Sequence, residues 1–113
     1  MDLQIEPRAG LTVARLSGEL GASEGPNLTD SLVDHACGEG SRLAIDLSGL
    51  KSLDSSGLGV LIHVVTRARM SGGRVMLVAP SSFVSGVLGV TRLDNWFDIC
   101  DSLSEAEKQL RAT

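Results

Sequence analysis

The sequence predicts an α/β fold with a small mixed sheet of four to five strands, packed with about four helices. The first observation is a strand-like run at 42–48, a helix-like segment at 56–71 and a second strand-like run at 75–79. This order is typical of a βαβ unit, whose strands are parallel and whose crossover is right-handed. The second is a pair of alternating runs near the amino terminus, which predicts an antiparallel pair. The third is the absence of repeats and linkers in 113 residues, which predicts one domain over 1–113.

The amino-terminal elements follow from alternation and then from a helical period. Leu3 and Ile5 alternate with polar neighbours, and 11–16 reads as the antiparallel partner after a tight turn at 8–10. Ser23 is a candidate N-cap for the first helix. The expected buried side of that helix carries residues at helical spacing, namely Leu28, Leu32 and Ala36.

The third strand turns Asp46 and Ser48 to one side and its leucines and isoleucine to the other. We expect this strand to end near Ser48, which makes 48–57 a loop. The period then changes to that of a helix with an apolar stripe of Leu58, Leu61, Ile62, Val65 and Ala68.

The closing part of the chain contains two further helices. Ser81 or Ser82 would cap the first, a short edge strand would lie within 96–99, and Ser102 with Glu105 fits a capping box for the last helix. The predicted buried face of that last helix is Leu103, Ala106 and Leu110.

Composition excludes several classes of partner. The formal net charge is −4 and Lys and Arg form no basic run, so direct nucleic-acid binding is not expected. The same balance argues against attachment to an anionic membrane surface, and no apolar run reaches about 18 residues. Cys37 and Cys100 lie far apart and form no CxxC pair, and the start of the chain does not resemble a signal peptide. We therefore expect a cytoplasmic protein with reduced thiols.

The sequence also lacks the patterns of an enzyme. His63 lies on the same predicted helix as Ser56 but about 10 Å further along its axis, beyond the reach of a serine–histidine pair. His35 has no carboxylate or cysteine partner at metal spacing, and no P-loop motif occurs. No catalytic residue, metal or cofactor is therefore predicted.

Polar residues gather between the third strand and the helix that follows it. Asp54, Ser55 and Ser56 precede two spaced glycines, Gly57 and Gly59, at the amino end of that helix. One of the polar residues could simply be the N-cap, because Asp and Ser are favoured caps. Three of them, with glycines that leave the backbone approachable, exceed what a cap requires, which favours a partner-binding site.

A phosphate at this position would change its charge strongly. On Ser56 it would add roughly −1.5 to −2 charges at a helix end that tolerates an anion. We expect it to face Asp54 and Asp46, so that binding could be switched without refolding.

A second, weaker stripe lies beside the apolar stripe of the same helix, at Gly57, Val60, Val64 and Arg67. It either packs against the neighbouring helix or forms part of a docking surface around Ser56.

The segment LAIDLSGLKSLDSSGLGVLI resembles the signature of STAS domains of the anti-sigma factor antagonist type. The family pattern is a hydrophobic residue, Asp-x-Ser, a short spacer and Asp-Ser-Ser/Thr-Gly-Leu-Gly. The stretches VARLSGEL and GGRVMLVAPSSFVSGVLGVTRLDNWFDI extend the resemblance over nearly the whole chain. The residues that meet the signature are Asp46, Ser48, Asp54, Ser55, Ser56, Gly57, Leu58 and Gly59.

The resemblance implies a STAS fold and a role in transcription regulation and stress response by partner switching. Such proteins bind an anti-sigma factor, a serine kinase with a histidine-kinase-like ATPase fold, and so free a sigma factor. The kinase phosphorylates the residue at the position of Ser56, which releases the antagonist, and a metal-dependent serine phosphatase resets it. The implied partner-binding residues are Asp46, Ser48, Asp54, Ser55, Gly57, Leu58, Gly59 and Val60.

One departure and several alternatives accompany the resemblance. Many members carry Asp or another polar residue after SGEL, where this chain has Gly21 and Ala22. The alternatives are a non-switching STAS scaffold, a module associated with a transporter or with lipid transport, and a domain that binds or hydrolyses nucleotide. Homodimer formation is left open.

Overall fold

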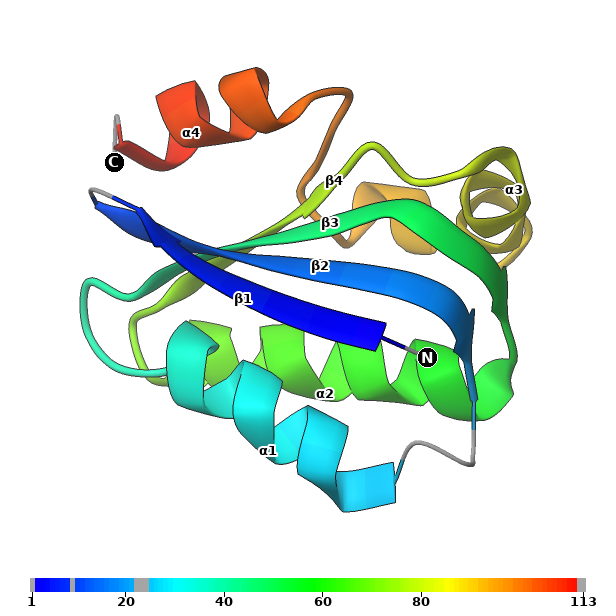
Figure 1. The fold of residues 1–113 in the computed structure, drawn as a ribbon, viewed down its shortest axis with the longest axis horizontal. Coiled ribbons are helices and arrows are strands. Elements are labelled where there is room, and N and C mark those ends of the chain that lie inside the picture. Colours follow the sequence, from blue (N-terminus) through cyan, green and yellow to red (C-terminus); the bar gives the residue numbers. More distant parts are fainter. Residues whose placement is uncertain (1, 9, 22–24, 112–113) are drawn as a thin grey trace.

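The structure is a computed structural model that describes residues 2–8, 10–21 and 25–111, with the side chains of 25–27 left aside. Within these residues the chain forms five strands, four α-helices and one short 3₁₀ helix (Figure 1). In chain order they are β1 (Asp2–Arg8), β2 (Leu11–Leu20), α1 (Gly25–Ala36), β3 (Arg42–Leu53), α2 (Ser55–Met70), β4 (Arg74–Val78), α3 (Ser82–Val90), η2 (Leu93–Asn95), β5 (Ile99–Cys100) and α4 (Leu103–Arg111).

The strands form one mixed sheet in the order β1-β2-β3-β4-β5. β1 pairs with β2 in antiparallel fashion, and every other neighbouring pair is parallel. The predicted α/β class, the amino-terminal antiparallel pair and the parallel βαβ unit are confirmed. Residue 9, at the centre of the predicted turn at 8–10, lies outside the described residues.

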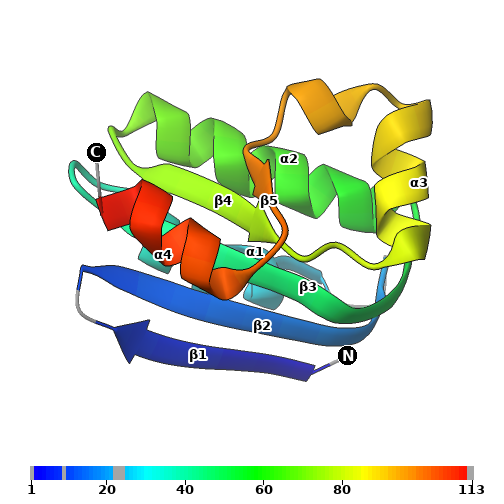
Figure 2. The same ribbon diagram turned by 90° about the horizontal axis from the view of Figure 1, so that it is seen from above.

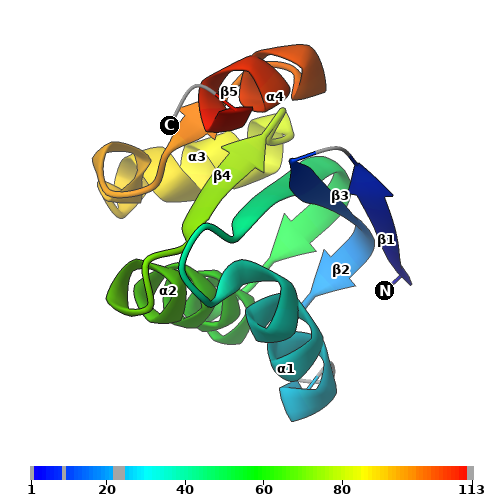
Figure 3. The same ribbon diagram turned by 90° about the vertical axis from the view of Figure 1, so that its left-hand side faces the viewer.

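Helices cover both faces of the sheet. Figure 1 shows α1 and α2 below the sheet and α4 above it, and Figure 3 shows the same three layers from the end. Figure 2, seen from above, shows α4 lying over the sheet and α3 beyond the end of β4. The core is divided accordingly, with the larger apolar cluster on the side of α1 and α2 and a smaller one beneath α4. The sequence did not predict which helices cover which face of the sheet, and the structure shows this from their packing.

The helical stripes agree largely with their prediction. Leu28, Leu32 and Ala36 of α1 are buried, whereas the proposed cap at Ser23 lies outside the described residues. In α2 the stripe is shifted, since Val64 is fully buried while Leu58 and Ile62 are only partly buried against the core. The capping box at the start of α4 is confirmed in part, because the Glu105 N–H donates to Ser102 Oγ at 3.2 Å.

The prediction that the third strand ends near Ser48 is wrong. β3 continues to Leu53, with Leu50 and Leu53 buried. The buried positions after Leu47 are three residues apart because the pairing of β2 with β3 shifts register at two places. An irregularity of this kind breaks the period of two from which the strand is recognised in a sequence.

The second half of β3 pairs with β2 alone. The ladder between β3 and β4 ends at Asp46 and Val78, whereas β2 and β3 remain paired to Leu20 and Leu53. The two strands therefore project beyond the rest of the sheet, and α3 packs beside this projection. Ser81 fixes the junction, because its Oγ caps α3 and also donates to the carbonyl oxygen of Leu50 at 2.8 Å.

Candidate partner-binding site

The site begins where β3 ends and α2 starts. Asp54 has an extended backbone, with φ −95° and ψ −176°, and its Oδ1 accepts the N–H of Gly57 at 2.9 Å. The N–H of Leu58 bonds to the Asp54 carbonyl oxygen, also at 2.9 Å. Asp54 is therefore the N-cap of α2. One of the three polar residues of the motif thus has the structural role of a helix cap.

Ser55 and Ser56 are the first two residues of α2 and both are exposed. Within the described residues, neither hydroxyl takes part in a hydrogen bond, because Asp54 already caps the helix. Two hydroxyls therefore remain accessible at a helix end whose backbone N–H groups favour an approaching anion.

The two glycines of the motif have different surroundings. A Cβ at Gly57 would lie 2.3 Å from the carbonyl oxygen of Leu20, so that strand β2 itself approaches this turn of α2. A Cβ at Gly59 would meet nothing within 4 Å. The expectation that both glycines leave room for a visitor therefore applies to Gly59, whereas the space at Gly57 is filled by the protein.

Gly21, the departure from the family pattern, contacts the same cap. A Cβ at this position would lie 2.5 Å from Asp54 Oδ2. The backbone N–H of Asp54 donates to the Leu20 carbonyl oxygen at 3.2 Å, which ties the end of β2 to the start of α2. Glycine thus allows the carboxylate of Asp54 to lie against the chain that leaves β2.

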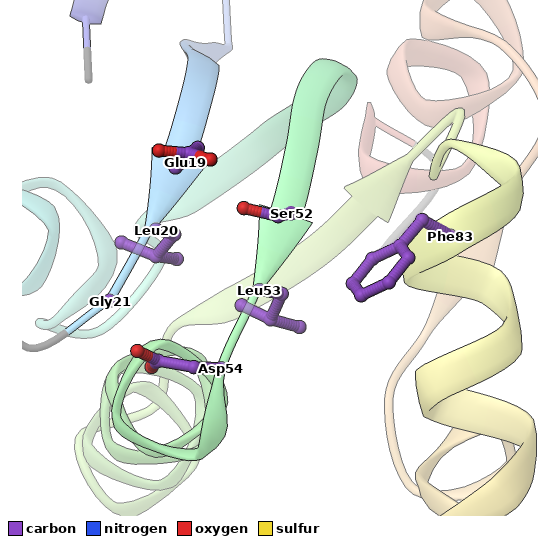
Figure 4. A pocket seen from close by; sticks show the side chains of 7 residues that line it. All are labelled: Glu19, Leu20, Gly21, Ser52, Leu53, Asp54 and Phe83. Carbon is purple, nitrogen blue, oxygen red and sulfur yellow. The ribbon is translucent and has the colours of Figure 1, made fainter.

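A hollow of about 500 Å³ opens beside the cap, between the ends of β2 and β3 and helix α3 (Figure 4). Figure 4 shows the ring of Phe83 reaching from α3 toward Leu53, with the carboxylates of Glu19 and Asp54 on the other side. Its lining residues are Glu19, Leu20, Gly21, Ser52, Leu53, Asp54 and Phe83. Within the described residues, neither acid forms an ion pair with a cationic side chain, so the hollow is acidic.

Two residues of the predicted site lie elsewhere. Asp46 is in the middle of β3, where its Oδ2 lies 3.6 Å from Arg15 Nε and its Oδ1 accepts the N–H of Ser48 at 2.9 Å. Because an extended strand rises roughly 3.3 Å per residue, Asp46 and Ser48 both lie far from Asp54 along β3. The expectation that a phosphate on Ser56 faces Asp46 is therefore corrected, because the strand runs on past the position where the loop was placed.

The second stripe of α2 is divided. Gly57 and Val64 are buried, Val60 is partly buried against the core, and Arg67 is exposed. Most of this stripe therefore packs inside the protein. Leu58, the remaining residue of the motif, is also partly buried against the core.

Groups that could support other chemistry lie outside this site. His63 is exposed on α2, and its separation from Ser56 along the helix remains that of the predicted helix. In the described part of the chain, no three or more His, Cys, Asp or Glu side chains are placed to hold a metal ion. None of the described helices has the length and apolar character needed to cross a membrane.

Two residues of the hollow were missed in the sequence. Glu19 stands in the strand-like segment SGEL, and Phe83 stands in the predicted third helix. Phe83 is 52% exposed. No local pattern marks either residue, because it is the projection of β2 and β3 past β4 that brings them beside Asp54.

Comparison of the sequence with known proteins identifies the family to which the chain is similar. The family described as "Mlab, STAS domain" matches residues 6–104. A Thermotoga maritima protein, named among the anti-sigma factor antagonists, is 37% identical over 70 residues, which is 62% of this chain and 62% of that protein. The chain thus matches less than two thirds of that relative's length.

Solved structures agree over the whole fold. The crystal structure of a Thermotoga maritima protein named among the anti-sigma factor antagonists superposes with a TM-score of 0.86 at 26% identity, covering 96% of this chain and 94% of the other. One from Mycobacterium paratuberculosis gives a TM-score of 0.81 at 25% identity, covering 97% and 93%. Unphosphorylated SpoIIAA, at 22% identity and a TM-score of 0.78 over 99% of this chain and 98% of its own, shares the fold. The chain belongs to the STAS domain family.

Proposed function

We propose that this chain acts as an anti-sigma factor antagonist switched by phosphorylation of Ser56. It binds an anti-sigma factor serine kinase with a histidine-kinase-like ATPase fold, and this binding frees a sigma factor. Phosphorylation of Ser56 by the same kinase releases the antagonist, and a metal-dependent serine phosphatase restores the hydroxyl. The chain is then a binding partner and a substrate, and the catalytic groups belong to the kinase.

The observation that carries the proposal is the exposed, uncommitted hydroxyl of Ser56 at the amino end of α2. Ser55 is exposed as well, and it is the family pattern that favours the second serine. A solved structure of the same fold, SpoIIAA of Bacillus, has been determined in its phosphorylated form. An architecture of this kind is therefore compatible with a phosphorylated residue.

The surroundings of Ser56 explain why a phosphate would weaken binding. Asp54 and Glu19 already make this edge acidic, and within the described residues neither is paired with a cation. A further −1.5 to −2 charges, roughly, would add to this field and bring its own hydration shell. A partner that docks closely on a neutral serine would then lose contact and meet concentrated negative charge.

The test is phosphorylation with defined kinases. Each histidine-kinase-like anti-sigma factor of the source genome is purified and incubated with the chain and Mg-ATP, and the modified residue is located by mass spectrometry. We expect one phosphoryl group on Ser56, none on Ser56→Ala, and a phosphoryl group that is still located on Ser56 in Ser55→Ala. Binding of the phosphorylated chain should be weaker by about tenfold or more. Absence of modification with every active kinase, or modification confined to another residue, contradicts the proposal.

A second function is favoured by one observation, which is that the matching family description names Mlab. In that case the same edge would serve as a constant docking site of a STAS scaffold. Ser56→Asp and Ser56→Ala would then bind their partner as the parent chain does, whereas under the switch Ser56→Asp should bind the purified kinase more weakly than Ser56→Ala.

A further inference from the structure

A pocket of about 340 Å³ lies at the end of the sheet that is remote from Ser56. It is bounded by the end of β1, the start of β2, the last turn of α1 and the start of β3. Figure 1 shows these segments on the side of the molecule opposite α3. We call it the basic pocket, and the polar side chains that line it are Arg8, Thr12, His35, Ser41 and Arg42.

The lining of the basic pocket is rich in basic side chains, although the chain as a whole has a formal net charge of −4. Arg8, His35 and Arg42 reach the pocket from three different elements, β1, α1 and β3. Among the described residues, none that lines the pocket carries a carboxylate. Cationic and hydrogen-bond-donating groups thus gather at one place, which is the arrangement that an anion requires.

The two arginines of the pocket are both held in place by the protein. Arg8 is ion-paired with Glu6 and Glu107, and neither of these acids lines the pocket. Because a guanidinium has five N–H donors, these two pairs do not exhaust it. Arg42 is half-buried, and its Nη1 donates to the carbonyl oxygen of Gly40 at 3.1 Å. Both guanidinium groups are therefore positioned before a ligand arrives, which lowers the entropic cost of binding.

The remaining polar groups of the pocket differ in what they can donate. The hydroxyl of Thr12 forms no hydrogen bond among the described residues, so its proton is available to a ligand. His35 is exposed, and an imidazole carries at least one ring N–H donor in either charge state. Ser41 Oγ instead donates to the carbonyl oxygen of Cys37 at 2.9 Å, which leaves it as an acceptor. Thr12 and His35 therefore add to the donors of the two arginines.

The carboxyl end of α1 opposes an anion only in part. His35 lies in the last turn of this helix, where the helix dipole is equivalent to about −0.5 of an elementary charge. Each guanidinium carries a full positive charge that is not lost by titration in a protein. The field of a full charge acts more strongly on a dianion than on a single carboxylate, which favours a phosphate group.

The shape of the pocket agrees with a phosphate that carries an organic group. The planar fork of an arginine matches two oxygens of a phosphate. The volume of about 340 Å³ lies at the lower end of the usual range for small-molecule sites, about 300–1,000 Å³, and exceeds the room that a bare ion needs. Pro7 and Leu11 give the pocket an apolar wall against which a small organic group can pack.

We propose that the basic pocket binds a small molecule that bears a phosphate monoester. Arg8, Thr12 and Arg42 hold the phosphate. Pro7 and Leu11 contact the organic group. The pocket and the start of α2 lie at opposite ends of β3, so this site is separate from the residue proposed as the switch. The inference goes beyond the proposed function and does not depend on it, because it adds a small ligand to a protein partner.

The probe is ribose 5-phosphate, with ribose and inorganic phosphate as reference ligands. Isothermal titration calorimetry of the chain at low salt should give one site with a Kd of about 1 mM or tighter, and the affinity should fall as salt is added. Inorganic phosphate should bind several-fold more weakly, and ribose should not bind. Amide chemical shifts should change where β2 and β3 begin and remain constant at the start of α2. The ligand should also raise the thermal midpoint, because it binds the folded chain only.

Two matched pairs of variants locate the site. Arg42→Gln should weaken the binding of ribose 5-phosphate by about tenfold or more, because a charge-assisted contact is lost. Its control is Arg67→Gln, since Arg67 is an exposed arginine of α2 that does not line the pocket. Thr12→Val removes only a hydroxyl and should weaken binding several-fold, whereas the exposed Thr66→Val should not. If Arg42→Gln fails to fold, the threonine pair still decides the question.

Three results would overturn the inference. The first is the absence of saturable binding of ribose 5-phosphate up to about 10 mM. The second is binding no tighter than that of inorganic phosphate, which would indicate an adventitious ion only. The third is an equal effect of each variant and its control, which would place the ligand elsewhere on the surface. No kinase takes part in these measurements, so their failure leaves the proposed phosphorylation of Ser56 standing, and the reverse also holds.

Discussion

At the scale of single residues, Gly57 and Gly59 show that one motif can combine two requirements. At Gly57 the carbonyl of Leu20 occupies the place of a side chain, so the glycine allows β2 to approach α2. At Gly59 the same substituent would lie in open space on an exposed turn of the helix. The first position is thus constrained by the fold, and the second is free for contact with a partner.

These two glycines give a prediction with an internal control. Gly57→Ala should destabilise the protein by about 2–4 kcal/mol, since a Cβ 2.3 Å from a backbone oxygen forces two elements apart. Gly59→Ala should instead be neutral or stabilise by about 0.5–1 kcal/mol, because alanine is the better helix former. Urea unfolding followed by circular dichroism measures both, and equal stabilities would contradict the reported geometry.

At the scale of elements, Ser81 determines where α3 lies. Its Oγ accepts the N–H of Val84 at 3.4 Å and donates to the carbonyl of Leu50 at 2.8 Å. One hydroxyl therefore begins the helix and holds it to the projecting half of β3. The position of Phe83, and with it the wall of the hollow, depends on this attachment.

Removal of this hydroxyl should loosen α3 more than removal of its neighbour. We expect Ser81→Ala to cost about 1–2 kcal/mol, as a lost cap together with an unpaired carbonyl. Ser82→Ala is the matched control, because Ser82 is exposed and its hydroxyl has no hydrogen bond among the described residues. Chemical denaturation measures the difference, and amide exchange should be faster in α3 of the first variant only. Equal behaviour would show that Ser81 does not anchor the helix.

At the scale of the whole molecule, the residue proposed as the switch lies on the surface. Its phosphorylation does not require the fold to rearrange. Ser56 is exposed and its hydroxyl makes no hydrogen bond among the described residues, so a phosphate on it displaces no packed group. The helix end partly stabilises the added charge, by about 0.3–1 kcal/mol, and the neighbouring acids oppose it.

Phosphorylation should therefore leave the fold as it is. We expect the free energy of unfolding of the Ser56-phosphorylated chain to lie within about 1 kcal/mol of that of the unmodified chain. Amide chemical shifts should change near the start of α2 and around the hollow, and remain constant in β1 and α4. Nuclear magnetic resonance and thermal unfolding of the two purified forms measure this, and shifts spread over the entire sheet would favour a conformational switch instead.

Much of this architecture could be predicted because its signals are local. Alternation identified β1 and β2, helical spacing identified the buried sides of α1 and α4, and the order strand–helix–strand predicted parallel pairing. The prediction failed at β3, where the spacing of buried residues from Leu47 to Leu50 is broken by shifts in register against β2. A local pattern cannot reveal such an irregularity, because the irregularity belongs to the pairing with another strand.

The sequence alone determined the class of the fold and the start of a helix within Asp54–Ser56 with more polar side chains than one cap needs, since caps and periodicity depend on neighbours in the chain. The tertiary structure decided which residues share that edge. In the structure Asp46 lies in the middle of β3, and Glu19 and Phe83 lie beside the cap residue Asp54. The physical reason is that β2 and β3 extend past β4, so residues from three distant segments meet where the shorter strand has ended.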